Sequence, residues 1–214
     1  MVFDWDGTLV DTLPAITRAN AEVLESYGLH YDDAAYRAVY SPDWRGMYRR
    51  LGLPDAVIEE AGLRWLGAYR ALMGEASAFP GVGAALDRLQ AAGFTMGLVT
   101  AGDRVVVEHQ LRATGLERHL QVRVCGDDMP FTKPHPAPLL RALDELGFRG
   151  RPERSIYVGD APDDMRMART VGARGVGIES ILGERNDLVA AGAAEVAPSV
   201  TTWVESFLTA ATAR

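Results

Sequence analysis

Hydrophobic and polar positions follow two different patterns along the chain. After residue 80, short apolar runs alternate with segments in which apolar residues recur at helical spacing. Strand–helix alternation of this kind is typical of right-handed crossovers, so it predicts a parallel sheet with helices on both faces. The predicted strands are 95–100, 121–125, 155–159, 174–178 and a short one near 195–196, and the predicted helices are about 82–92, 104–114, 136–147, 162–171 and 201–210.

The first three residues are apolar and end abruptly at Asp4. They predict one more buried strand, which leads into a polar loop with the sequence Asp4-Trp5-Asp6-Gly7-Thr8. Three residues are few for a central strand, so we expect the natural protein to begin a few residues upstream of Met1.

Between about residues 14 and 75 the pattern is helical throughout, and no segment shows the alternation of a strand. We therefore predict an α/β fold in which 1–12 and 80–214 form a Rossmann-like core domain. Residues 13–79 are predicted to form an all-helical domain inserted after the first strand.

Composition narrows the class of protein. Of the 214 residues 48% are hydrophobic and 24% charged, which are ordinary values for a globular chain. The net charge of −7, without a basic stripe, argues against nucleic-acid binding. A single cysteine excludes an intrachain disulfide and a multi-cysteine zinc site. The N-terminus does not resemble a signal peptide, and no apolar run is long enough for a membrane span, so we expect a soluble cytoplasmic protein; its oligomeric state stays open.

Polar residues follow the predicted strands at the ends where a parallel α/β sheet binds its ligands. Asp4, Asp6, Thr100 and Asp160 stand at such ends, and Lys133 lies in the loop after 121–125. Each alone has an ordinary structural explanation, such as a helix-start acid or a solvated lysine. Together they predict a site, because clustered carboxylates need a cation and their hard oxygens suit Mg²⁺. The lysine beside them indicates phosphate chemistry.

Four segments resemble the motifs of the haloacid dehalogenase (HAD) superfamily. They are the stretch from Asp4 to Thr12, then Thr100, then Lys133-Pro134-His135-Pro136, and finally Gly159-Asp160-Ala161-Pro162-Asp163-Asp164. The helical block resembles the small α-helical (C1-type) cap of this superfamily. As a whole the chain is most similar to the phosphoglycolate phosphatase-like branch, and the resemblance implies an enzyme.

The resemblance implies that Asp4 attacks phosphorus to form an aspartyl-phosphate, while Asp6 protonates the leaving alcohol and then activates water. It implies Mg²⁺ bound by the Asp4 carboxylate, the Asp6 carbonyl and Asp160. True dehalogenases lack the second acid, so Asp6 favours phosphoryl transfer. Asp164 is expected to orient the metal's water or Lys133.

The same resemblance implies that Lys133, the Thr100 hydroxyl and the Ala101 amide bind phosphoryl oxygens, with Gly7 and Thr8 also in the phosphate site. Many relatives have Asn after the threonine. Here the sequence is Ala101-Gly102-Asp103, which makes phosphoglycolate itself less secure as the substrate, and we expect Asp103 to cap the following helix.

In the helical domain, Trp44, Arg45 and Arg49 are candidates for gripping an anionic substrate. The alternative is an amphipathic helix whose arginines lie in solvent. The four histidines lie in separate segments, and we expect them at the surface or in turns.

Three functions remain open. The first is a Mg²⁺-dependent phosphatase of small phosphorylated metabolites, of the phosphoglycolate or sugar phosphate class. The second is a phosphomutase similar to β-phosphoglucomutase, and the third is a catalytically silent binding module. A dinucleotide site is disfavoured, because no G-x-G-x-x-G follows the first strand.

Overall fold

The computed structural model describes residues 1–41 and 43–212. The chain divides into two compact units: Met1–Asp11 with Ser77–Arg214, called here the core unit, and Thr12–Ala76, called the helical unit. The sequence predicts these boundaries between residues 12 and 13 and between 79 and 80, a few residues from where the two units divide.

Six strands of the described chain form one parallel sheet in the core unit, in the order β5-β4-β1-β6-β7-β8. Their bounds are β1 Val2–Phe3, β4 Gly97–Val99, β5 Val122–Val124, β6 Ile156–Gly159, β7 Arg174–Ile178 and β8 Glu195–Ala197. β1 is central, and its Val2 is in register with Gly97 on one side and Tyr157 on the other. The predicted parallel α/β sheet is confirmed, and both residues of β1 are fully buried as expected of a central strand.

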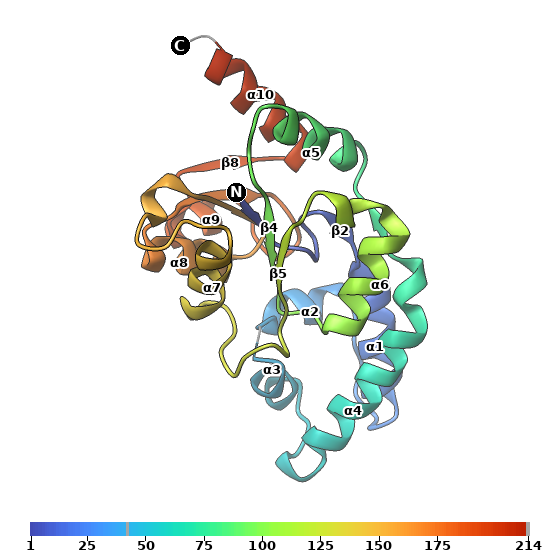
Figure 1. Ribbon diagram of the computed structural model, residues 1–214. Helices are drawn as coiled ribbons and strands as arrows, with labels where there is room; N and C mark the ends of the chain where they lie inside the picture. Colours follow the sequence, from blue (N-terminus) through green and yellow to red (C-terminus); the bar gives the residue numbers. More distant parts are fainter. Residues whose placement is uncertain (42, 213–214) are drawn as a thin grey trace. The chain divides into compact units, whose positions relative to one another are not determined.

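Helices lie on both sides of these strands (Figure 1). α7 (Ala137–Glu145), α8 (Pro162–Val171) and α9 (Arg185–Ala191) share one apolar core with the sheet. On the other side are α5 (Val82–Ala91), α6 (Arg104–Thr114) and α10 (Val200–Thr212), with α5 packed on α10. All but α9 match a predicted helix.

A two-stranded antiparallel ribbon, β2 (Val10–Asp11) and β3 (Ser77–Ala78), was not predicted. Val10 is in register with Ala78, and the Phe79 amide donates to the Leu9 carbonyl at 3.0 Å. The chain therefore leaves and re-enters the core unit side by side. Two residues per strand are too few to show a strand period in the sequence.

The helical unit contains α1 (Leu13–Glu25), α2 (Asp33–Val39), α3 (Trp44–Arg50), α4 (Asp55–Leu72) and a 3₁₀ turn at Met73–Glu75. α1 and α3 both pack on α4. Its interior is partly polar, because Asn20 accepts from the Tyr48 hydroxyl and donates to that of Tyr31. The predicted helical character of this segment is confirmed.

None of the described helices combines the length and the apolar character needed to cross a membrane.

Candidate active site

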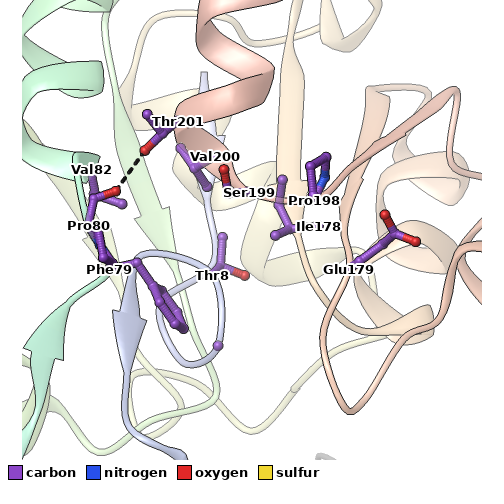
Figure 2. Close-up of a pocket in the computed structure, with 11 residues that line it drawn as sticks. Thr8, Phe79, Pro80, Val82, Ile178, Glu179, Pro198, Ser199, Val200 and Thr201 are labelled. Atoms are coloured by element: carbon purple, nitrogen blue, oxygen red, sulfur yellow. Dashed lines mark hydrogen bonds between the residues drawn. The ribbon is translucent and has the colours of Figure 1, made fainter.

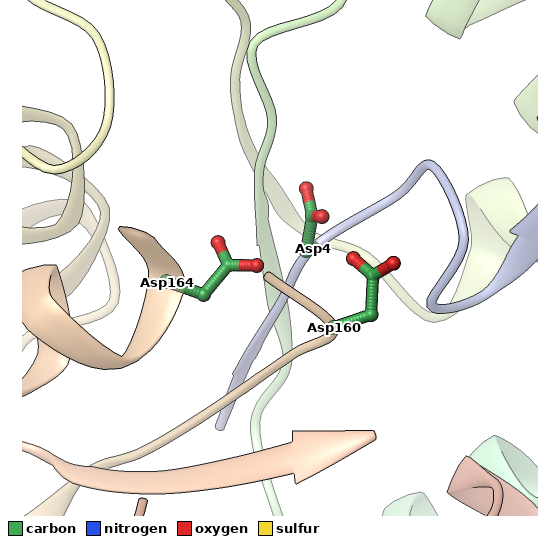
Figure 3. A group of neighbouring side chains, drawn as sticks. All are labelled: Asp4, Asp160 and Asp164. Carbon is green, nitrogen blue, oxygen red and sulfur yellow. The ribbon is translucent and has the colours of Figure 1, made fainter. Parts of the chain in front are cut away.

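Three buried carboxylates meet at the carboxyl ends of β1 and β6 (Figure 3). Asp4 directly follows β1, Asp160 directly follows β6, and Asp164 stands in the first turn of α8. One carboxylate oxygen of each lies within 4.8 Å of the others. The predicted convergence of strand-end residues is therefore what the fold produces.

Lys133 joins this cluster from the loop between β5 and α7. Its Nζ lies 2.7 Å from Asp4 Oδ1 and 2.8 Å from Asp164 Oδ1, and all three side chains are buried. The contact with Asp164 has hydrogen-bond geometry, whereas that with Asp4 is an ion pair only. Burial by itself lowers the pKa of Lys133, but the charges of Asp164 and Asp4 outweigh burial and hold the pKa well above its usual range, so the ammonium stays charged.

Asp164 is committed to positioning its neighbours. Its Oδ1 accepts from Lys133 and lies 3.0 Å from the Tyr157 hydroxyl, and its Oδ2 accepts from the Ala161 amide at 3.0 Å. A Cβ on Gly159 would lie 2.5 Å from the Asp164 carboxyl carbon, so only glycine lets this carboxylate lie against the strand end. With both oxygens occupied, Asp164 is poorly placed to be a metal ligand.

Asp160 is placed differently. Its Oδ1 accepts from the Thr8 hydroxyl at 3.4 Å, while its buried Oδ2 has no hydrogen-bond partner among the described residues. Gly7 borders this oxygen with a φ of +73°, and a Cβ there would lie 2.4 Å from Oδ2. A side chain at position 7 would therefore clash with the Asp160 oxygen that has no hydrogen-bond partner, and glycine leaves room beside it.

The electrostatics of the cluster call for a cation. Burial is the largest cause that raises the pKa of Asp4 well above its usual value, opposed by Lys133 and reinforced by the other aspartates. Burial, followed by the charge of Asp164, raises the pKa of Asp160 to about 7. When all three buried carboxylates are ionised, the single ammonium leaves excess negative charge that a cation would balance, and hard oxygen donors are what Mg²⁺ prefers. These residues fit a divalent cation.

Asp6 and Thr100 meet beside the cluster. The Thr100 hydroxyl donates to Asp6 Oδ2 at 3.4 Å and accepts from the Gly102 amide at 3.0 Å. Ala101, which lies between Thr100 and Gly102 in the sequence, is exposed. As expected, Asp103 caps α6, since its Oδ1 accepts from the Val106 amide at 3.2 Å.

The chain matches the model of haloacid dehalogenase-like hydrolases over residues 1–178. It belongs to this family.

Relatives of this HAD hydrolase place it in the phosphoglycolate phosphatase-like branch of the family. It is 31% identical to the phosphoglycolate phosphatase of Yersinia pestis, with 94% of this chain and 92% of the relative covered. It is 35% identical to that of Xanthomonas campestris pv. campestris, with 80% and 79% covered. The structure of a Thermotoga maritima protein, assigned provisionally as a β-phosphoglucomutase, superposes with a TM-score of 0.74 at 26% identity, and 97% of each chain is covered. The chain is an enzyme, a phosphoglycolate phosphatase-like hydrolase of the HAD family.

Two supporting contacts of the HAD site were not predicted. The Trp5 indole, between Asp4 and Asp6 in sequence, donates to Gln110 Oε1 at 2.7 Å, and both side chains are buried. The second is the contact of Tyr157 with Asp164. A buried Gln on an amphipathic helix and a Tyr in a buried strand are the only signals the sequence carries for either.

A further network ties the loop after β4 to the loop after β5. The Arg104 guanidinium forms a two-pronged ion pair with Asp128, whose Oδ2 also accepts from the Cys125 amide at 2.8 Å. The Arg104 amide donates to Asp127 Oδ1 at 3.0 Å. These contacts hold the Thr100 loop of the HAD site in place.

In the helical unit the candidate arginines are already paired. Arg45 forms an ion pair with Glu59 and lies 4.3 Å from the centre of the Trp44 ring, and Arg49 donates to Asp55 at 2.6 Å. Both arginines are exposed. A substrate role for these three residues stays a prediction. Among the histidines, His119 is not at the surface: it is buried in the turn after Leu116–Arg118 and bonded to Gln90.

A cavity of about 260 Å³ lies in the core unit beside the loop after β1 (Figure 2). Gly7 and Thr8 line it, together with Phe79 and the start of α10, where Thr201 donates to the Pro80 carbonyl at 3.0 Å. Thr8 thus lines the cavity, and its hydroxyl also donates to Asp160.

Proposed function

We propose that this HAD hydrolase is a Mg²⁺-dependent phosphatase that hydrolyses small organic phosphate monoesters through an aspartyl-phosphate on Asp4. The observation that carries the proposal is the buried Asp4 carboxylate, 2.7 Å from the Lys133 ammonium and next to Asp160, whose Oδ2 has no partner among the residues described. This chemistry needs a nucleophile, a positively charged side chain held in place and a free oxygen ligand for the metal, and Asp4, Lys133 and Asp160 would supply these three groups.

In the proposed reaction a carboxylate oxygen of Asp4 forms a bond to phosphorus, and the bond from phosphorus to the ester oxygen breaks. Asp6 gives a proton to the departing oxygen, so the alcohol leaves neutral. Asp6 then takes a proton from water, whose oxygen attacks phosphorus and frees the Asp4 carboxylate. Without substrate the Thr100 hydroxyl donates to Asp6 at 3.4 Å, and it would have to exchange Asp6 for a phosphoryl oxygen when substrate binds.

Asp4, the Asp6 carbonyl and Asp160 are the groups proposed to hold Mg²⁺. The bound ion would neutralise charge between the Asp4 carboxylate and the phosphate dianion. The raised pKa of Asp160 supports this assignment, because a buried carboxylate with an uncovered oxygen is stabilised in its charged form by a cation.

Lys133, the Thr100 hydroxyl and the Ala101 amide are proposed to bind the phosphoryl oxygens, with the backbone of Gly7 and Thr8 on the metal side. Lys133 is already fixed by Asp164 and Asp4 on folding, so little reorganisation accompanies binding. The Thr8 hydroxyl itself contacts Asp160, so Thr8 acts partly by orienting that carboxylate.

For the substrate we propose phosphoglycolate or a sugar phosphate. Support comes from the curated relatives, which are phosphoglycolate phosphatases at 31–35% identity over most of both chains. The helical unit is proposed to act as a cap that selects the alcohol. Arg45 and Arg49 would have to exchange Glu59 and Asp55 for a substrate carboxylate.

A phosphomutase is the second candidate, favoured by the 26% identity to the Thermotoga maritima protein over 97% of both chains. It would use the same residues and return the phosphoryl group to a sugar. Release of free phosphate without a bisphosphate activator separates the two functions. A silent binding module is disfavoured, because nucleophile, acid, lysine and both further aspartates are present.

The test is phosphate release from a panel of phosphorylated metabolites with Mg²⁺ or with EDTA. The proposal expects activity that requires Mg²⁺ and disappears in Asp4→Asn. The exposed Asp187→Asn of α9 is the control and should keep full activity. Activity retained by Asp4→Asn would overturn the mechanism, and isomerisation of a sugar phosphate without net release would support the mutase.

A further inference from the structure

Tyr157 is a fully buried residue in the middle of β6 that the proposed chemistry does not use. Its ring belongs to the apolar core between the sheet and α7–α8, but its hydroxyl is polar and must find a partner there. Two acceptors are in reach: Asp164 Oδ1 at 3.0 Å and the Val99 carbonyl at 3.1 Å.

The hydroxyl has one proton for these two acceptors. An ionised carboxylate is the stronger acceptor, so the proton is directed at Asp164. Burial is the main cause that raises the pKa of Tyr157 well above its usual value, which keeps the phenol protonated and able to donate. Asp164 Oδ1 therefore receives two donors, Tyr157 and Lys133.

The sheet places Tyr157 on the face from which the nucleophile emerges. Tyr157 is in register with Val2, and Asp4 follows Val2 by two residues, so the side chains of Val2 and Asp4 point to the same face. Lys133 Nζ is nearly equidistant from Asp4 Oδ1 and Asp164 Oδ1, at 2.7 and 2.8 Å. The ammonium is therefore shared between the two carboxylates, and its position depends on where Asp164 is held.

We propose that Tyr157 is a positioning residue that fixes Asp164 and thereby holds the Lys133 ammonium at the place where the phosphoryl group binds. Without the hydroxyl, Lys133 is the sole side-chain donor to Asp164 Oδ1 in the described structure, and the carboxylate can draw the ammonium away from Asp4. The inference rests on the proposed function, since it assigns Lys133 to phosphate binding.

The test compares Tyr157→Phe with Tyr48→Phe. Both remove one buried hydroxyl that donates to a side-chain oxygen, but Tyr48 lies in the helical unit and donates to Asn20. Affinity for inorganic phosphate is measured by calorimetry with saturating Mg²⁺, and the free energy of unfolding is measured in urea. We expect phosphate to bind about tenfold more weakly to Tyr157→Phe and unchanged to Tyr48→Phe. Equal phosphate affinity in both variants would show that Tyr157 is structural only.

A double-mutant cycle shows whether Tyr157 acts through Asp164. In an Asp164→Ala background, Tyr157→Phe should change phosphate affinity less than about twofold, because the side-chain acceptor of the Tyr157 hydroxyl is already gone. A further loss of about tenfold in that background would place the effect at the Val99 carbonyl and the Thr100 loop, and would overturn the proposal.

Rescue separates positioning from damage to the core. Incorporation of 4-aminophenylalanine at position 157 keeps the ring and replaces the hydroxyl by an amino group that can still donate to Asp164, and should restore phosphate affinity to within about twofold of the wild type. This variant also serves if Tyr157→Phe fails to fold; failure of a folded rescue variant to bind phosphate would contradict the proposal. If the wild-type protein neither binds phosphate nor releases it from any ester, the proposed function fails instead, which is a different result from unchanged binding by Tyr157→Phe.

Discussion

Replacing Asp160 with Asn should stabilise the protein when no metal is present and should remove most of its stabilisation by Mg²⁺. The carboxylate is buried, its Oδ2 has no described hydrogen-bond partner, and its pKa is raised from 3.8 to about 7, first by burial and then by Asp164. Ionising it in the folded, metal-free protein therefore costs about 4 kcal/mol more than in the unfolded chain, because each pKa unit corresponds to about 1.4 kcal/mol.

The sign of the pH dependence follows from the raised pKa. The contribution of Asp160 to stability is fully present below pH 3.8, is lost progressively as pH rises, and is lost completely above about pH 7. Asn carries no charge at any of these pH values. In EDTA, Asp160→Asn should therefore be more stable than the wild type at pH 8, by up to about 4 kcal/mol, and the difference should shrink towards pH 5.

The assay is urea unfolding at pH 5 and pH 8, with EDTA or with saturating Mg²⁺. Mg²⁺ at about 100 times its dissociation constant should stabilise the wild type by about 2.7 kcal/mol and the variant by much less. Asp144→Asn, which removes an exposed carboxylate paired with Arg149, is the control and should respond to Mg²⁺ like the wild type. The reasoning is refuted if Asp160→Asn is less stable than the wild type in EDTA at pH 8, or if Mg²⁺ stabilises both equally.

Three further predictions concern the loop after β1. Asp6→Asn should lower kcat on alkyl phosphates by about 10²–10⁴-fold, while phosphate still binds. The loss of kcat should be smaller on 4-nitrophenyl phosphate, because its leaving group needs no proton. Equal losses on both substrates would argue against an acid role for Asp6. Gly7→Ala should weaken Mg²⁺ binding in a calorimetric titration, because its Cβ would meet Asp160 Oδ2 at 2.4 Å. Gly28→Ala has a similar φ of +74° but no described atom within 4 Å of the added Cβ, so it should carry the backbone strain of about 1–2 kcal/mol alone, and equal Mg²⁺ affinity in both variants would count against the metal assignment. Gln110→Leu should reduce the free energy of unfolding by about 1–3 kcal/mol, because the buried Trp5 N–H loses its acceptor; an unchanged indole ¹H–¹⁵N signal of Trp5 would contradict this.

Local patterns in the sequence predict most of the helices and strands of the core unit. The predicted helices at 104–114 and 162–171 and the strand at 174–178 have the bounds that the structure shows, and the other predicted elements differ by a few residues at their ends. Pro and Gly mark many of these bounds, as at α8, which begins at Pro162 and is followed by Gly172 in the left-handed conformation. Helix α9 escaped prediction because its seven residues are too few for a clear helical period.

The site was predictable to the extent that its residues stand at strand ends. Asp4, Thr100 and Asp160 are placed by the topology of a parallel sheet, which the alternating pattern already indicates. Lys133 is harder to place, because a loop residue has no fixed direction until the loop folds, and its position rests on Asp4 and Asp164.

Contacts between distant segments could not be predicted from one sequence. Trp5 and Gln110 are 105 residues apart, and the hydroxyl of Tyr157 meets a carbonyl 58 residues away on another strand. In the sequence Tyr157 is only an aromatic residue in an apolar run, for which core packing is the ordinary role. Likewise, the pairing of Arg45 with Glu59 depends on how α3 packs on α4.

The most direct test of the central claim is to trap the phosphorylated enzyme. The protein is mixed with its best substrate and Mg²⁺, quenched in acid within the first turnovers, digested and analysed by mass spectrometry. The account predicts a phosphoryl group on the peptide that contains Asp4, removable by hydroxylamine and absent from Asp4→Asn. Phosphate release with no phosphorylated peptide at any quench time, or with the phosphoryl group on another residue, would contradict the assignment of Asp4 as the nucleophile.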